Sequence, residues 1–171
     1  IRDRIYTGGT IGMKTNPETG ALSPFDFNDM YEEFPYLRML NVDISVLHFK
    51  PIDSSNVTPA LWIELARLIR DSYASFDGFV VLHGTDTMAY TSSALSYLIQ
   101  NSPKPIIITG AQKPISMEIT DAKTNLLDSL RFAACPDAHG VCIVFNGKVI
   151  AGTRAKKLQS KSFNAFDSIN F

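Results

Sequence analysis

The stretch Phe79-Val80-Val81-Leu82-His83-Gly84-Thr85-Asp86-Thr87-Met88 decides the fold of this chain. Its four apolar residues indicate a short buried strand, and the glycine and hydroxyl residues that follow indicate a turn at the end of that strand. Near the N-terminus, Ile5-Tyr6 precedes Thr7-Gly8-Gly9-Thr10-Ile11-Gly12 in the same arrangement. Ligands of open parallel sheets bind beyond the carboxyl ends of the strands. The two turns are therefore predicted to meet at one site.

Strand-like and helix-like segments alternate along the rest of the chain. A helix is expected to begin at Thr58-Pro59, because threonine can cap a helix and proline suits its first position. The expected strands are 42–47, 79–82, 106–108, 141–145 and 148–150, and the other expected helices are 89–100 and one capped by Asp121. This order predicts an α/β domain with an open, mainly parallel sheet flanked by helices, in a flavodoxin-like or Rossmann-like arrangement of three layers.

Apolar spacing predicts which side of each helix packs on the sheet. The expected inward residues are Leu61, Leu65, Leu68 and Ile69 in the first helix, Ala94, Leu95, Leu98 and Ile99 in the second, and Leu126, Leu127, Leu130, Ala133 and Ala134 in the third. Residues 13–24 contain several turn formers and are expected to form a mobile loop of about a dozen residues, a length typical of functional loops.

Composition bounds the class of protein. A chain of 171 residues with 45% hydrophobic and 19% charged residues is typical of one globular domain. Its net charge of -1 gives no electrostatic support for a nucleic-acid or membrane partner. The histidines at 48, 83 and 139 have no metal-ligand spacing. Cys135 and Cys142 are expected to be buried thiols, which is compatible with a reducing cytoplasm.

Five motifs in order resemble the L-asparaginases of the bacterial type, in particular their cytoplasmic type I form. The motifs are Thr7 to Gly12, Asp53-Ser54-Ser55, His83 to Tyr90, Thr109 to Gln112 and Gly152 to Lys157. The resemblance spans nearly the whole chain. It implies that residues 1–171 are the N-terminal catalytic domain of a cytoplasmic homo-oligomer, whose smaller C-terminal domain lies outside this chain.

The resemblance implies hydrolysis of L-asparagine to L-aspartate and ammonia, through an acyl-enzyme and without a metal or organic cofactor. The nucleophile falls on Thr10, and the other catalytic residues on Thr85, Asp86 and Lys157. A threonine hydroxyl is a weak nucleophile, so it needs a positioned base. A relay from Lys157 through Thr85 would supply one.

The same resemblance implies a substrate site. Asp86 would bind the ammonium group of asparagine, and Thr85 would lie beside the substrate. Asp53, Ser54 and Ser55 would form the turn that meets the α-carboxylate with hydroxyl and backbone donors. The backbone around Ala111 would face the carboxamide.

Each assignment has a structural alternative. The threonines of both turns and Asp86 could serve only as turn or helix caps, and residues 53–55 could be an ordinary turn before the helix at Thr58. Lys157 could be a solvated surface lysine. His83 is expected to be a structural residue at the end of its strand.

Two departures from the family pattern keep other functions open. The tyrosine expected in the loop after the nucleophile is replaced by Thr19-Gly20-Ala21-Leu22, and Tyr6 and Tyr31 are candidates to substitute for it. The resemblance also implies a second domain outside this chain. The chain could therefore be an isolated, catalytically weak binding or assembly domain, or an asparaginase-like amidotransferase subunit. Glutamine remains a possible second substrate, because one methylene gives only about 1–3 kcal/mol of discrimination.

Overall fold

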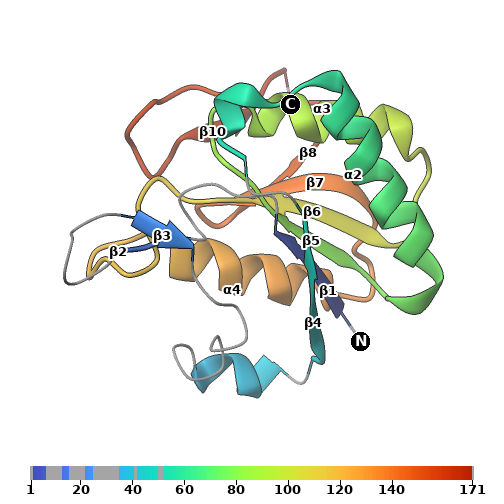
Figure 1. Ribbon diagram of the computed structural model, residues 1–171, viewed down its shortest axis with the longest axis horizontal. Coiled ribbons are helices and arrows are strands. Elements are labelled where there is room, and N and C mark those ends of the chain that lie inside the picture. Colours follow the sequence, from blue (N-terminus) through green and yellow to red (C-terminus); the bar gives the residue numbers. More distant parts are fainter. Residues whose placement is uncertain are drawn as a thin grey trace.

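The structure is a computed structural model that describes residues 2–6, 13–15, 22–24, 35–40, 42–49 and 52–170 (Figure 1). Its main sheet has six strands in the order β4-β1-β5-β6-β7-β8. These strands are β1 (Arg2–Tyr6), β4 (Ile44–His48), β5 (Phe79–Leu82), β6 (Pro105–Thr109), β7 (Gly140–Phe145) and β8 (Lys148–Ala151). All neighbouring strands are parallel except β7 and β8, which are antiparallel.

In the described part of the chain, three α-helices and several short elements accompany the sheet. The helices are α2 (Pro59–Ser72), α3 (Met88–Leu98) and α4 (Ala122–Ala133). The short helices are η3 (Pro35–Leu40), η4 (Ser54–Asn56) and η5 (Tyr73–Ser75). Two small antiparallel pairs are β2 (Met13–Thr15) with β3 (Leu22–Pro24), and β9 (Ala155–Lys157) with β10 (Phe166–Ser168).

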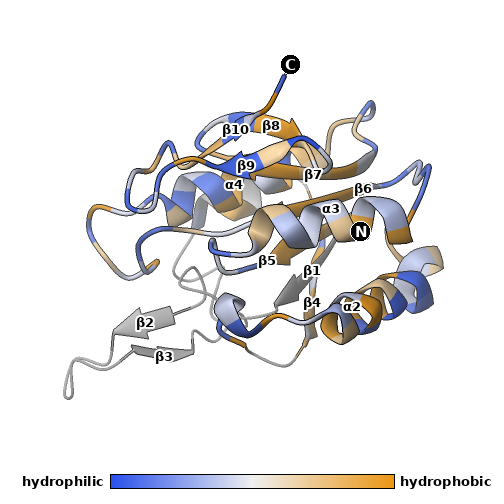
Figure 2. Cartoon of the chain, turned by 90° about the horizontal axis from the view of Figure 1, so that it is seen from above, coloured by the Kyte–Doolittle hydropathy of each residue, from blue (hydrophilic) through white to orange (hydrophobic). Residues whose placement is uncertain are grey.

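The helices cover both faces of the sheet, with α2 and α3 on one face and α4 on the other (Figure 1). Alternate residues of β5 supply both cores: Val80 and Leu82 pack toward α4, whereas Phe79 and Val81 pack toward α2 and α3. The central strands are largely apolar, while α2 mixes apolar and hydrophilic residues (Figure 2). The predicted three-layer α/β fold with a mainly parallel sheet is confirmed.

Two successive crossovers have opposite hands. The chain moves from β5 to β6 to β7 in one direction across the sheet, but α3 and α4 lie on opposite faces. Since about 98% of parallel crossovers are right-handed, one of these two has the rare hand. The crossover through α4 begins with residues 110–121, which leave β6 at the edge where β5 also ends.

The strand order places a topological switch point between β1 and β5. From β1 the chain goes outward to β4 and then returns across β1 to β5. Tyr6 and Leu82, the last residues of β1 and β5, lie opposite each other in the parallel register. Ligands bind at such switch points in open α/β sheets. The strands that precede the two glycine turns therefore end side by side.

Two local predictions are confirmed. Thr58 is the N-cap of α2, with its side chain accepting a hydrogen bond from Leu61 N, and Pro59 is the first helical residue. At the β7–β8 turn, Asn146 and Gly147 have φ angles of 50° and 71°. Two consecutive left-handed residues are what a two-residue hairpin requires, and asparagine and glycine adopt that conformation readily.

The predicted inward face of α3 is wrong at Leu98, which is 50% exposed. The buried face consists instead of Met88, Thr91, Ser92 and Leu95. Ser92 can be buried because its hydroxyl donates to the Gly152 carbonyl at 3.0 Å. A hydroxyl whose hydrogen bond is made can face a core, so the apolar stripe alone was a misleading guide.

Residues 13–24 are not an unbroken loop, because β2 and β3 pair at its two ends, with Met13 opposite Pro24. The turn formers Asn16-Pro17 and Thr19-Gly20 lie outside the described residues, and the mobility of this segment stays a prediction. Both cysteines are free thiols. Cys142 is buried as expected, and its burial raises the pKa of the thiol to about 12, but Cys135 is partly exposed.

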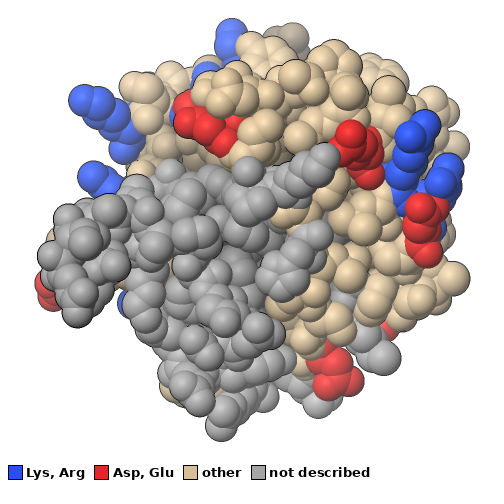
Figure 3. Space-filling view, in the orientation of Figure 1, with Lys and Arg blue, Asp and Glu red and all other residues tan. Residues whose placement is uncertain are grey.

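Surface charge, helix length and metal-ligand clusters give little evidence for a particular partner. On the face shown in Figure 3, described acidic and basic side chains are interspersed. Among the described residues, no helix is long and apolar enough to cross a membrane. The same residues contain no group of three or more His, Cys, Asp or Glu side chains that could hold a metal ion.

Candidate active site

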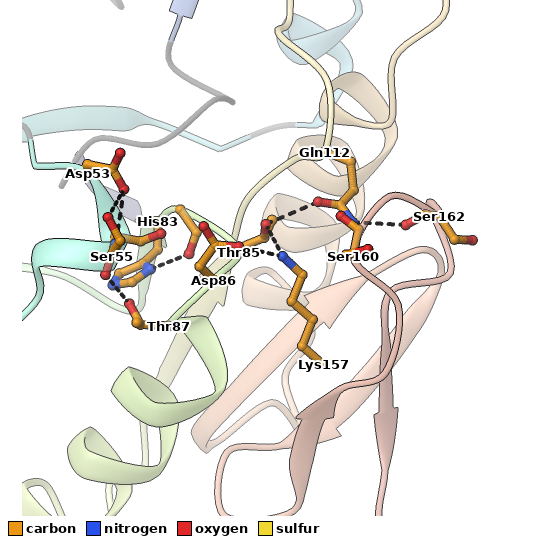
Figure 4. Close-up of polar contacts among 12 residues, drawn as sticks. Asp53, Ser55, His83, Thr85, Asp86, Thr87, Gln112, Lys157, Ser160 and Ser162 are labelled. Atoms are coloured by element: carbon orange, nitrogen blue, oxygen red, sulfur yellow. Dashed lines mark hydrogen bonds and ion pairs between the residues drawn. The ribbon is translucent and has the colours of Figure 1, made fainter.

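Lys157 joins two residues of the turn after β5. Its Nζ donates to Thr85 Oγ1 and to Asp86 Oδ1, both at 2.8 Å (Figure 4). The lysine comes from the end of β9, more than 70 residues further along the chain. Its side chain is only 17% exposed, whereas that of Asp86 is 66% exposed. The lysine is therefore held in place, and the carboxylate remains open to a ligand.

The turn at residues 53–56 packs directly against the turn after β5. Thr87 Oγ1 donates to the Ser54 carbonyl at 2.7 Å. At Gly84, an added Cβ would lie 2.5 Å from Ser54 Oγ, so only glycine permits this approach. Asp53 Oδ1 accepts from Ser55 N at 2.9 Å and from Ser55 Oγ at 2.8 Å. These hydrogen bonds keep the pKa of Asp53 below its usual range.

Buried His83 fixes the start of the same turn. Its Nδ1 lies 2.7 Å from the Gly84 carbonyl, and its Nε2 lies 3.0 Å from Thr91 Oγ1. A carbonyl can only accept, so Nδ1 carries the proton and Nε2 accepts from Thr91. Thr91 in turn accepts from Trp62 Nε1 at 2.9 Å. Burial lowers the pKa of His83, which keeps the ring neutral. These contacts agree with the predicted structural role.

The turn after β6 supplies Gln112, which touches the site from another side. Thr85 Oγ1 donates to Gln112 Oε1 at 3.1 Å. The amide nitrogen of Gln112 donates to the carbonyls of Ser160 and Ser162, at 3.2 Å and 3.1 Å. The chain at Gln112 is held by Asp121, whose two carboxylate oxygens accept from Gln112 N at 3.0 Å and 2.9 Å.

Gln112 was not among the predicted site residues, and the predicted capping role of Asp121 is wrong. Asp121 stands at the N-cap position of α4 as predicted, but its side chain does not cap the helix. It is buried and accepts instead from Gln112, Lys113 and Asn125, while Thr120 Oγ1 accepts from Ala122 N. The position of Gln112 just past a strand end was an available signal. Only the backbone of its neighbour Ala111 was singled out.

The structure brings some predicted site residues together and leaves one undescribed. Thr85, Asp86 and Lys157 form one contact group, and residues 53–55 lie beside it. Ala111 is buried at the start of the turn after β6. Thr10 lies outside the described residues. Described strand β1 ends at Tyr6 beside the end of β5, at the edge of the sheet where this group lies.

Asp86 and Lys157 also border a cleft of about 860 Å³ between the start of α3 and the β9–β10 pair. Its described lining includes Tyr90 and Arg154 but neither Thr85 nor the turn at 53–56.

The arrangement has the parts of an acyl-transfer site. A lysine donates to a threonine hydroxyl, an exposed carboxylate is available for a cation, and a neighbouring turn offers hydroxyl and backbone donors. Hydroxyl groups need a nearby base to act as nucleophiles or proton carriers, and lysine is one residue that can serve as that base. These parts support the predicted roles, which remain predictions.

Comparisons with known proteins identify the family. The family model described as Asparaginase, N-terminal matches residues 4–171. L-asparaginase 1 of Escherichia coli K12 is 40% identical over 171 residues, which cover 96% of this chain and 49% of that protein. A glutamyl-tRNA(Gln) amidotransferase component of Methanosphaera stadtmanae is 39% identical over 178 residues, 97% of this chain and 39% of that protein.

A solved structure agrees. The thermostable L-asparaginase of Thermococcus kodakarensis superimposes with a TM-score of 0.91 at 35% identity. The match covers 99% of this chain and 51% of the Thermococcus chain. The chain thus spans about half the length of these two asparaginases. With a family model over nearly all of its residues and such relatives in sequence and structure, the chain belongs to the asparaginase family.

Proposed function

We propose that this chain is the N-terminal catalytic domain of an L-asparaginase, which hydrolyses L-asparagine to L-aspartate and ammonia. The observation that carries the proposal is the contact of Lys157 with Thr85 and Asp86, three residues that the family pattern assigns to catalysis. Family membership and the names of the relatives support the same reaction. A cytoplasmic homo-oligomer, with neither nucleic acid nor membrane as partner, is part of the proposal.

The reaction would proceed in two halves. Thr10 Oγ attacks the carboxamide carbon of asparagine and loses its proton to the Thr85–Lys157 relay. The C–N bond breaks, the nitrogen gains a proton and leaves as ammonia, and an aspartyl ester remains on Thr10. Water then attacks the ester and releases aspartate. Asp86 would hold the ammonium group, since an exposed anion in this position can pair with a cation.

The turns position the rest of the substrate. Ser54 and Ser55 would meet the α-carboxylate, and the hydrogen bonds of Asp53 to Ser55 would hold that turn in shape. The backbone at Ala111 would face the carboxamide. This division predicts that changes at residues 53–55 and Asp86 weaken binding, whereas changes at Thr10 and Thr85 remove turnover.

Ammonia release from L-asparagine and from L-glutamine tests the proposal. We would measure the 171-residue chain and the same chain followed by the C-terminal half of the E. coli relative. Thr10→Ala and Thr85→Val should abolish release, while Thr124→Ala and Thr124→Val, at an exposed site on α4, should not. Aspartate binding without turnover in either form would instead favour a catalytically weak binding domain. Release that requires a partner subunit and transfer RNA would favour the amidotransferase.

A further inference from the structure

Gln112 has an orientation that its partners determine. Its two ends touch different parts of the molecule: the amide nitrogen faces the carbonyls of Ser160 and Ser162, and the oxygen faces Thr85 (Figure 4). Carbonyl oxygens accept hydrogen bonds and cannot donate. The NH₂ group must therefore point toward residues 160 and 162, which leaves Oε1 as the atom that faces Thr85.

This orientation sets the direction of the hydrogen bonds at Thr85. Because Gln112 Oε1 can only accept, the Thr85 hydroxyl proton points to it at 3.1 Å. The oxygen of the same hydroxyl accepts from Lys157 Nζ at 2.8 Å. In this arrangement the proton of Thr85 points away from Lys157. The relay of the proposed reaction needs the opposite, a hydroxyl that gives its proton to a neutral Lys157 while it receives one from Thr10.

Gln112 is fixed at its backbone and extends into the loop that follows Lys157. Buried Asp121 accepts from Gln112 N, and Asn125 Nδ2 donates both to Asp121 and to the Gly110 carbonyl. The loop consists of residues 159–164, between β9 and β10. Its ends are joined by Leu158 N, which donates to the Ala165 carbonyl at 2.7 Å. Gln112 thus connects a rigid turn to the loop and to Thr85.

We propose that Gln112 is a positioning residue that couples the orientation of the Thr85 hydroxyl to the loop at residues 159–164. The Gln112 amide holds the Thr85 oxygen next to Lys157. The Thr85 proton stays hydrogen-bonded to Gln112 Oε1 until the hydroxyl rotates toward the lysine. A displacement of the loop moves the Gln112 amide and so changes the orientation of the Thr85 hydroxyl. In the other direction, loss of the Thr85 hydroxyl makes the loop more mobile. The catalytic meaning of this coupling rests on the proposed function, but the coupling itself does not.

The coupling can be measured without turnover, by amide hydrogen exchange in the 171-residue chain. The probes are the amides of Leu158, Gln159 and Asn164, which have hydrogen-bond partners within the loop or at its ends. We would compare the parent with Gln112→Met, with Thr85→Val and with the double variant. Gln100→Met is the control, because Gln100 is exposed in the turn just after α3.

Both single variants should speed exchange of these amides about fivefold to tenfold, a change typical of one lost hydrogen bond. The double variant should be no faster than Gln112→Met, because residues in one network are not additive. Parent-like exchange in Thr85→Val, or independent effects that multiply in the double variant, would overturn the proposal. Amides in β6 serve as a check that the fold is unchanged.

Kinetics separate positioning from substrate binding. Gln112→Met should lower kcat for asparagine about tenfold and leave KM near the parent value, because Gln112 hydrogen-bonds Thr85, whose proposed role is in turnover. A change confined to KM, or unchanged kcat alongside a loosened loop, would overturn the positioning role. If neither the 171-residue chain nor its extended form releases ammonia, the proposed function fails, and the exchange measurements alone decide the coupling.

Discussion

Replacing Gly84 by alanine adds one methyl group at the contact between the two turns of the candidate site. The new Cβ would lie 2.5 Å from Ser54 Oγ and 2.6 Å from Ser54 Cβ. Non-bonded carbon atoms normally approach to about 3.5–4.0 Å. Ser54 is buried, and Thr87 Oγ1 holds its carbonyl at 2.7 Å, so the turn at 53–56 has little freedom to retreat.

We expect Gly84→Ala to lower the free energy of unfolding by about 1–3 kcal/mol, the usual cost of overpacking. Urea unfolding followed by circular dichroism would measure this. Gly140→Ala is a contrasting control: its Cβ would meet nothing within 4 Å, but its φ of +69° is unfavourable for alanine, whereas Gly84 does not have such a φ. That control isolates backbone strain, which costs about 1 kcal/mol.

A second substitution, at Ser54, tests whether the contact between residue 84 and the Ser54 side chain causes the loss of stability. In Gly84→Ala with Ser54→Gly, both clashing atoms of Ser54 are gone, and the nearest remaining atom is Ser54 N at 3.4 Å. The double variant should therefore recover most of the stability lost in Gly84→Ala, despite the small entropic cost of the new glycine. A double variant less stable than Gly84→Ala alone would refute the contact as the cause.

Three further predictions concern buried residues, two beside the site and one in the core. Burial lowers the pKa of His83 below 6.5, so the unfolded chain binds a proton first as the pH falls. The free energy of unfolding should therefore decline below about pH 6.5, by up to about 1.4 kcal/mol per pH unit. In urea titrations at several pH values, His83→Gln should flatten this decline and His139→Gln should not. Asp121→Ala leaves two backbone donors, Gln112 N and Lys113 N, unpaired and should lower the free energy of unfolding by about 1–3 kcal/mol. Asp128→Ala in α4 is the control and should cost less. Equal losses would contradict the role of Asp121. Cys142 is buried and its pKa is raised to about 12, so it should react with a thiol reagent only on unfolding. Partly exposed Cys135 should react in the folded chain. Peptide mapping that finds Cys142 modified first would contradict this prediction.

The sheet and its helices could be predicted because their signals are local. Phe79 to Leu82 is a continuous apolar run, as a strand buried on both faces requires, and Thr58-Pro59 is a helix start that depends only on neighbouring residues. The hand of the crossover through α4 could not be predicted. It depends on which face of the sheet the helix covers, and α4 offers no local signal for that choice.

Polar residues were predicted less well because their partners are distant in the chain. Ser92 faces inward only because Gly152 comes close enough to accept its hydrogen bond, and the carboxylate of Asp121 turns back to Gln112 rather than to its own helix. Within the candidate site, Thr85, Asp86 and Lys157 were named from family motifs, and the structure places them in contact. Gln112 was missed because its role lies in an orientation that depends on partners far away in the chain.

The central proposal is that this chain is the catalytic domain of an asparaginase that acts through an ester on Thr10. The most direct measurement mixes the chain with L-asparagine, quenches it with acid within one turnover and maps the adduct by mass spectrometry. Trypsin should release residues 5–14, which contain both Thr7 and Thr10. We predict one aspartyl group on Thr10, and neither adduct nor ammonia from Thr10→Ala. An aspartyl ester on another residue, or ammonia release by Thr10→Ala at the parent rate, would contradict the claim.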